Sequence, residues 1–247
     1  MRFRLGFLMT VCGLALGAAF GAHGQTARKA GPARLHAPAT VEERWRESLD
    51  AFSASDRDKA PHAGGVLFVG SSSIRLWADL ESQFGAVPVV KRGFGGSRMS
   101  DCARYADRLV VAYQPRTVIV YAGDNDLAEG RTPQQVLESF QTFVERVHDE
   151  LPDTRIAYLS IKPSPLRSAL MPLATETNAL IRAYSTTTPN LDFIDVYSKM
   201  LDARGQPRAD LYLADALHLS PAGYAVWKSA IASHLAPAVS SGASPGL

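Results

Sequence analysis

The feature that most constrains the fold is the alternation of short apolar runs with longer segments of helical period. Five apolar runs rich in β-branched residues occupy residues 66–69, 87–90, 117–121, 155–161 and 191–196. Runs of this length and composition are typical of strands that are buried on both faces of a parallel sheet. The alternation therefore predicts a single-domain α/β fold, with a doubly wound, flavodoxin-like parallel sheet of about five strands and helices on both faces.

Three segments carry specific helix signals. Apolar residues at helical spacing predict an amphipathic helix over residues 41–52, packed on the rim of the sheet. The segment 132–151 begins with Thr132, Pro133 and Gln135, which fit a capping box with proline at the first helical position. Ser220-Pro221 gives the last helix the same kind of start. These signals place helices before, between and after the predicted strands.

The first 24 residues have the pattern of a secretory signal peptide. Arg2 and Arg4 precede an apolar stretch over residues 5–20, and small residues up to Gly24 follow it. The alternative is an uncleaved membrane anchor, but a spanning helix needs about 20 apolar residues and this stretch is shorter and rich in glycine. We therefore expect cleavage after Gly24, export to the periplasm or the medium, and no stable membrane insertion of the mature chain.

Composition divides the rest of the chain. Residues 25–39 are expected to form a disordered leader, 40–238 the folded domain, and 239–247 a flexible tail. Signal cleavage removes two arginines, so 24 basic residues balance 24 acidic ones and no nucleic-acid partner is predicted. Cys102 would be the only cysteine of the mature chain, which excludes an internal disulfide and a thiolate metal site.

Polar clusters lie where predicted strands end. Gly-Ser-Ser-Ser occupies residues 70–73, Gly-Phe-Gly-Gly-Ser 93–97, Gly-Asp-Asn-Asp 123–126, and Asp-Ala-Leu-His lies near the C-terminus at 215–218. Open parallel sheets bind ligands at the carboxyl ends of their strands. A serine after a buried strand, together with a histidine three residues after an aspartate, supplies a nucleophile, a base and an orienting acid. The sequence therefore predicts acyl-transfer chemistry at this edge of the sheet.

These blocks resemble those of the SGNH, or GDSL-like, hydrolases, and the resemblance runs from about residue 65 to the helix after residue 223. It implies that Ser72 is the nucleophile, His218 the base and Asp215 the acid that orients the histidine. It also implies an oxyanion hole formed by the N–H groups of Ser72 and Gly96 and by the side-chain amide of Asn125. The fold implied is the doubly wound sheet already predicted from the alternation.

Simpler structural roles stay open for several of these residues. The serines at 71–73 are also suited to capping a helix. Gly96 is also suited to a simple turn with positive φ, and Gly93 and Gly95 compete with it as the glycine of the site. Asp124 and Asp126 are expected to be structural or to shape the pocket. The family usually has acidic residues at the positions of Ser71 and Ser97, so the field around the intermediate should differ from the family pattern.

The activity implied by the resemblance is that of a secreted or periplasmic serine esterase that works through an acyl-enzyme. Carbohydrate O-acetyl esterase, thioesterase and acyltransferase activities use the same residues and are alternatives, as is a ligand-binding protein of this fold without turnover. The partner would be a small-molecule or glycan ester. No cofactor is expected, and no metal either, because the sequence has no His-Glu-x-x-His motif or comparable cluster.

The loop after the fourth predicted strand carries two cations, Lys162 and Arg167, and prolines at 163 and 165 stiffen it. If both cations face the pocket, the enzyme should prefer small acyl groups on polar or anionic carriers. Replacement of either by alanine should then raise KM more than it lowers kcat. The alternative is that both cations are solvated or pair with nearby acids.

Overall fold

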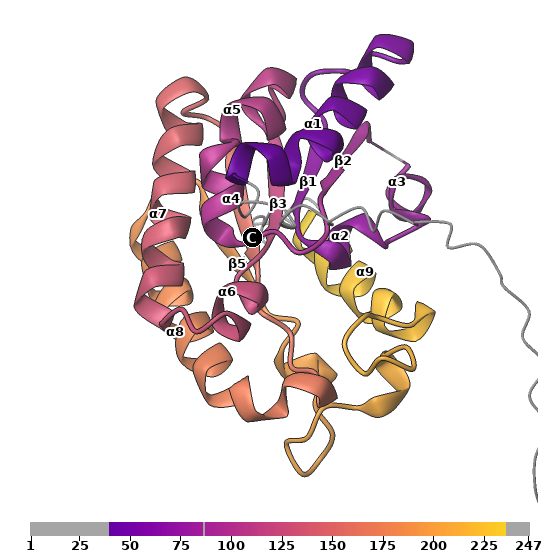
Figure 1. The fold of residues 1–247 in the computed structure, drawn as a ribbon, viewed down its shortest axis with the longest axis vertical. Helices are drawn as coiled ribbons and strands as arrows, with labels where there is room; N and C mark the ends of the chain where they lie inside the picture. The colour runs from indigo at the N-terminus through magenta and orange to yellow at the C-terminus, as the bar shows by residue number, and fades with distance from the viewer. Residues whose placement is uncertain (1–39, 86, 236–247) are drawn as a thin grey trace, which may run out of the picture. The chain divides into compact units, whose positions relative to one another are not determined.

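The computed structural model describes residues 40–85 and 87–235, and the expected signal peptide, leader and tail lie outside these ranges. The described chain is built around one five-stranded sheet with the strand order β2-β1-β3-β4-β5, in which every pair is parallel (Figure 1). This is the flavodoxin-like order. The predicted fold class is therefore confirmed.

The strands are β1 (Val66–Gly70), β2 (Val89–Gly93), β3 (Thr117–Tyr121), β4 (Arg155–Leu159) and β5 (Leu191–Ile194). In the register of the central strands, Gly70 at the end of β1 lies opposite Gly93 of β2 and Tyr121 of β3. The carboxyl ends of these three strands are therefore level. The polar clusters that follow them leave the sheet at one edge.

The second strand differs from its predicted position at 87–90, because it begins at Val89 and includes Lys91 and Arg92. Two features explain the shift. Pro88 lacks a backbone N–H and stands just before the strand, as proline does at strand starts. Because β2 is an edge strand, its charged side chains reach partners outside the sheet, with Lys91 bonded to the Trp77 carbonyl and Arg92 paired with Asp56.

Side chains of the strands point alternately to two hydrophobic layers. Leu67 and Val69 of β1 join the layer under α1 (Val41–Asp58), α4 (Met99–Arg104), α5 (Ala106–Leu109), α7 (Pro133–Glu150) and α8 (Met171–Thr187). Val66 and Phe68 join the layer under α2 (Ser72–Arg75), α3 (Leu80–Gln83) and α9 (Pro221–Leu235). Figure 1 shows α7 and α9 on opposite sides of the sheet. Helices therefore cover both faces, as predicted.

Short elements complete the described chain: α6 (Asp124–Ala128) and the 3₁₀ turns η1 (Val111–Tyr113), η2 (Pro165–Leu170), η3 (Ser198–Met200) and η4 (Ala209–Leu211). The capping box of α7 is confirmed, because Gln135 N–H donates to Thr132 Oγ1 at 3.2 Å and Thr132 N–H donates to Gln135 Oε1 at 3.1 Å. Within residues 40–85 and 87–235, no helix has the length and apolar character needed to span a membrane.

The first helix is longer than its apolar pattern predicts, since α1 continues six residues beyond Phe52 to Asp58. Asp56 in this added part pairs with Arg92 and accepts a hydrogen bond from Tyr113 Oη at 2.6 Å. Nearer its start, α1 buries Trp45 edge-on against Phe94, with ring centroids 5.0 Å apart. Tertiary contacts therefore hold both parts of α1, whereas its apolar periodicity predicts only residues 41–52.

Candidate active site

Ser72 is the first residue of α2, directly beyond β1. Gly70, two residues earlier, has φ of +146°, and a Cβ at this position would lie 1.9 Å from the Tyr121 carbonyl oxygen. Only glycine permits this close approach of β1 to β3 at the strand end. The backbone N–H of Ser72 belongs to the first turn of α2, where helix donors have no intrahelical acceptor.

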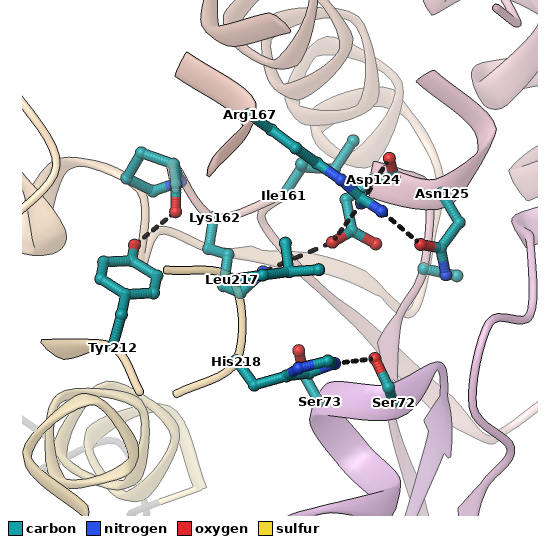
Figure 2. Close-up of polar contacts among 12 residues, drawn as sticks. Ser72, Ser73, Asp124, Asn125, Ile161, Lys162, Arg167, Tyr212, Leu217 and His218 are labelled. Atoms are coloured by element: carbon teal, nitrogen blue, oxygen red, sulfur yellow. Dashed lines mark hydrogen bonds and ion pairs between the residues drawn. The ribbon is translucent and has the colours of Figure 1, made fainter. Parts of the chain in front are cut away.

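His218 and Asp215 complete a hydrogen-bonded chain with this serine. His218 Nε2 lies 2.9 Å from Ser72 Oγ, and His218 Nδ1 lies 2.6 Å from Asp215 Oδ2 (Figure 2 shows the first contact). Because a carboxylate can only accept, Nδ1 carries the proton of the neutral ring and Nε2 is left as the acceptor facing the serine hydroxyl. This tautomer is the one that a general base requires.

The loop that holds Asp215 is organised by its own backbone. Asp215 Oδ1 accepts hydrogen bonds from the N–H groups of Leu217 at 3.0 Å and His218 at 2.9 Å, and Ala216 between them has φ of +56°. The hydrogen bond from His218, followed by these backbone bonds, lowers the pKa of the Asp215 carboxyl to about 2. The carboxylate is therefore charged at neutral pH.

Two further donors stand next to the serine. Gly96 lies in the turn after β2 with φ of +83°, and its N–H has no acceptor among the described residues. Asn125 lies in the first turn of α6, and its Nδ2 donates to the Ser97 carbonyl at 3.0 Å, which ties the two turns together. An amide nitrogen carries two hydrogens, so one remains for a ligand. The backbone N–H of Gly96 and one amide hydrogen of Asn125 are therefore available to a ligand in the groove that Ser72 also lines.

The acids that flank Asn125 are both buried. Asp126 accepts the Met99 N–H through both carboxylate oxygens, at 3.0 and 3.2 Å, and burial raises its pKa to about 6. Asp124 pairs with Arg167 at 3.1 Å and with Lys162 at 3.4 Å. Neither aspartate is bonded to His218. Their contacts hold α4 and the segment after β4 against the Asn125 turn, which agrees with the structural role expected for them.

Ser72, Gly96, Asn125 and His218 line one open groove of about 680 Å³. Most of its other lining residues come from the first two helices, with Arg44, Trp45, Glu47, Ser48 and Ala51 on α1 and Arg75 on α2. Gly95 and Leu217 complete the lining. Arg44 donates to the Gly96 carbonyl at 3.3 Å, and the Arg75 guanidinium lies against the backbone of Gly95. The groove therefore combines the four expected site residues with two exposed guanidinium groups.

Lys162 and Arg167 lie elsewhere than the substrate-binding hypothesis expects, since neither lines this groove. The Lys162 side chain is 1% exposed and its ammonium faces Asp124, as Figure 2 shows, and burial lowers its pKa. Arg167 holds Asp124 and Asn125. Both cations instead pair with a nearby acid, Asp124, which is the alternative that the sequence left open. A buried ammonium that is already paired is poorly placed to meet a substrate.

The two serines at positions where related sequences usually have acids are both buried. Ser71 N–H donates to the Tyr121 carbonyl, and the Ser97 carbonyl accepts from Asn125. The Ser97 hydroxyl has no partner among the described residues. These positions therefore act through their backbones, without placing carboxylates beside the site.

Sequence reasoning missed the groove arginines. A signal existed for Arg75, because residues three apart on a helix lie side by side and Arg75 is three residues after Ser72. No local signal marks Arg44, which reaches Gly96 across 52 residues of sequence. Across residues 40–85 and 87–235, no three His, Cys, Asp or Glu side chains are grouped as a metal site would need.

Residues 63–226 match the GDSL-like Lipase/Acylhydrolase family. The chain belongs to this family. The match covers the serine, glycine, asparagine and histidine blocks in one continuous span. This hydrolase is therefore a member of a family of ester-cleaving enzymes. A comparison with curated proteins found no match to the chain.

Solved structures with this fold include a GDSL-like lipase from Bacteroides thetaiotaomicron, with 18% identity and a TM-score of 0.64 over 75% of this chain and 96% of that chain. A lipase/acylhydrolase from Enterococcus faecalis has 20% identity and a TM-score of 0.56 over 69% and 94%. A carbohydrate esterase family 3 protein from Talaromyces cellulolyticus has 16% identity and a TM-score of 0.57 over 70% and 96%. At these identities the likeness establishes the fold.

Proposed function

We propose that this hydrolase cleaves carboxylic esters through an acyl-enzyme on Ser72. The observation that carries the proposal is the chain from Asp215 through His218 to Ser72, with links of 2.6 and 2.9 Å, at the edge of the sheet beside Gly96 and Asn125. Nucleophile, base and orienting acid are within hydrogen-bond reach, which is the geometric requirement for this chemistry.

In the first half-reaction, Ser72 Oγ attacks the ester carbonyl while His218 Nε2 takes the hydroxyl proton. The N–H groups of Ser72 and Gly96 and the free amide hydrogen of Asn125 donate to the oxyanion that forms. Collapse of this intermediate breaks the bond to the alcohol, and His218 returns the proton to that oxygen. His218 then takes a proton from water, which attacks the acyl-enzyme carbonyl. The bond to Ser72 Oγ breaks, and His218 returns the proton to that oxygen as the acid leaves.

The groove supports short acyl groups on polar carriers. Its lining contains charged and small residues, and only Trp45 and Leu217 are large and apolar. A long acyl chain needs continuous apolar surface to repay the removal of its methylenes from water. An O-acetylated sugar fits such a groove better, and the carbohydrate esterase from Talaromyces cellulolyticus shares the fold.

The test combines covalent labelling with an ester panel. A fluorophosphonate probe should label one serine, and peptide mapping should place it at Ser72. Purified wild type should hydrolyse acetyl esters faster than long-chain esters, and Ser72→Ala should lower kcat by several orders of magnitude without changing the unfolding temperature. Activity that survives Ser72→Ala, or a label elsewhere, would refute the assignment.

We further propose that the chain is exported and cleaved near Gly24, as its first 24 residues suggest. N-terminal sequencing of the protein from cell fractions should find a mature chain that begins near Gln25. A chain that retains Met1 in the membrane fraction would contradict export with cleavage. Since Cys102 is then the single cysteine, a reducing agent should leave the thermal stability of the mature protein unchanged.

A further inference from the structure

Arg167 joins the two residues at the start of α6. Its Nη2 donates to Asn125 Oδ1 at 3.0 Å, and its Nη1 donates to the Asp124 carbonyl at 2.9 Å and pairs with Asp124 Oδ2 at 3.1 Å. Figure 2 shows the guanidinium lying between these two side chains, on the side away from Ser72 and His218. One planar group therefore fixes both the backbone and the amide of the turn that carries Asn125.

The contact decides which way the Asn125 amide faces. Arg167 can only donate, so it requires the amide oxygen on its side. The Ser97 carbonyl can only accept, so it requires the amide nitrogen on the other side. A flipped amide would put N–H groups against the guanidinium and two oxygens against each other. With Arg167 in place, the second amide hydrogen is held for a ligand in the groove.

Arg167 is itself held in place by Asp124 and by the loop that precedes it. Asp124, which it pairs with, also accepts from the buried Lys162 ammonium at 3.4 Å. The loop before Arg167 contains Pro163 and Pro165, and the Pro163 carbonyl accepts a hydrogen bond from the buried Tyr212 hydroxyl. Only 21% of the Arg167 side chain is exposed. These contacts make its position a property of the fold that does not depend on a bound substrate.

We propose that Arg167 is a positioning residue for the oxyanion hole. This proposal rests on the proposed esterase function. Arg167 orients the Asn125 amide, and its positive charge on Oδ1 polarises the amide and strengthens the N–H donor that faces the intermediate. Because this donor acts when negative charge develops on the carbonyl oxygen, the arginine affects the transition state more than substrate binding. This role differs from direct contact with the substrate, which would change KM.

The test compares kcat and KM for a short-chain ester in wild type and in Arg167→Ala, Asn125→Ala and the double variant. We expect Arg167→Ala to lower kcat about 10- to 100-fold, less than the 10²–10³ typical of losing a whole donor, with KM within about twofold. In the Asn125→Ala background, Arg167→Ala should lower kcat less than about twofold, because the amide that Arg167 orients is gone. Arg182→Ala, which removes an exposed ion pair with Asp195, is the matched control.

Arg167→Lys carries the test if the alanine variant does not fold. Lysine can keep the ion pair with Asp124 but lacks the planar fork that also reaches Asn125. We expect its kcat to stay at least about fivefold below that of wild type. The rate at which a fluorophosphonate labels Ser72 gives a second readout, since the tetrahedral phosphorus centre uses the same donors, and it should fall in parallel.

Three results would overturn the proposal: a rise in KM at unchanged kcat, an effect of Arg167→Ala that is undiminished in the Asn125→Ala background, or full activity of Arg167→Lys. The first would mean direct binding of substrate, the second an independent role, and the third that charge alone is enough. Wild-type activity that does not depend on Ser72 is a different result, because it refutes the esterase assignment itself.

Discussion

Asp215 and Asp126 each belong to one half of the site, and their surroundings are opposite. Asp215 is 47% exposed, and hydrogen bonds from residues two and three positions along the chain hold its pKa at about 2. Asp126 is 2% exposed, is bonded to Met99 at a separation of 27 residues, and has its pKa raised to about 6. The half with Asp215, called the exposed half, has an exposed and locally bonded acid, whereas the half with Asp126, called the buried half, has an acid that is buried and bonded at long range.

The difference shows how the two halves divide the work. In the proposed mechanism, the exposed half needs a charged acid and a histidine that can pass protons to and from substrate and water. The buried half needs donors that do not move, so that no reorganisation is required when charge develops. Substitutions in the first should therefore change the chemistry with little effect on stability, whereas some substitutions in the second should change both.

The largest effect in this comparison should come from Asp215→Asn. Asparagine can still accept the two backbone hydrogen bonds, but its amide would face Nδ1 with a donor and favour the tautomer that cannot act as base. We expect kcat to fall roughly 10³- to 10⁴-fold with an unchanged unfolding temperature. Steady-state kinetics with Asp210→Asn as the control measure this, because Asp210 is an exposed, ion-paired aspartate of the same region. Activity within about tenfold of wild type would contradict the role of Asp215.

Asn125→Ala should have the next largest effect, a fall in kcat of about 10²- to 10³-fold with little change in KM, since one oxyanion donor is lost. Asn125→Asp provides a sharper version of the same experiment. Aspartate keeps an acceptor for Arg167 but has no N–H for the intermediate, so its kcat should fall at least as far. If the aspartate variant keeps wild-type kcat, the amide hydrogen is not a catalytic donor.

The buried half should also show itself in the pH dependence of stability. Asp126 binds its proton more tightly in the folded state, since its pKa of about 6 exceeds the ordinary 3.8. Its contribution to the free energy of unfolding therefore falls as the pH rises from about 4 to 6, by about 3 kcal/mol for two pKa units. Asp215 has a lowered pKa, so it stabilises the fold at any pH above its pKa in the unfolded chain. This contribution is lost as the pH falls towards 2.

Asp126→Asn tests this sign. The variant can still accept the Met99 N–H but has no charge to desolvate, so its stability relative to wild type should increase between pH 4 and pH 7. Urea unfolding at several pH values measures the difference, with Asp210→Asn as the control. A difference that is independent of pH would show that Asp126 does not titrate in this range.

The smallest expected effect concerns the groove. Arg75 has no ion-pair partner among the described residues and lies beside Gly95 at the mouth of the site. Arg75→Ala should raise KM about three- to tenfold for esters of anionic carriers and leave neutral esters unchanged, with the difference shrinking at high salt. Arg146→Ala, which removes an exposed ion pair with Asp107, is the control. Equal effects on both ester types would remove Arg75 from substrate recognition.

The same contrast explains what the sequence could predict. Asp215 and His218 are three residues apart and are bonded to each other, so spacing alone indicates their relationship. Ser72 follows an apolar strand, and glycine marks the turn at Gly96. Each of these signals is local, and the four residues that they indicate lie together in the structure.

The long-range contacts could not be predicted in this way. Arg167 reaches Asn125 across 42 residues, and nothing in the run from Lys162 to Arg167 shows whether its cations face the groove or a buried aspartate. The predicted ends of β2 and α1 were wrong for a related reason, since the contacts of Asp56 with Arg92 and Tyr113 join segments that are far apart in sequence. Periodicity describes a segment by itself, whereas these features depend on what packs against it.

The walls of the groove have a consequence for biosynthesis. Arg44 and Trp45 come from the first described helix, and His218 comes from the loop before the last one, so the beginning and the end of the domain meet at the site. A chain that ended near residue 200 would contain Ser72, Gly96 and Asn125 but would lack Asp215 and His218. The groove is therefore complete only when almost the entire domain has been synthesised and folded.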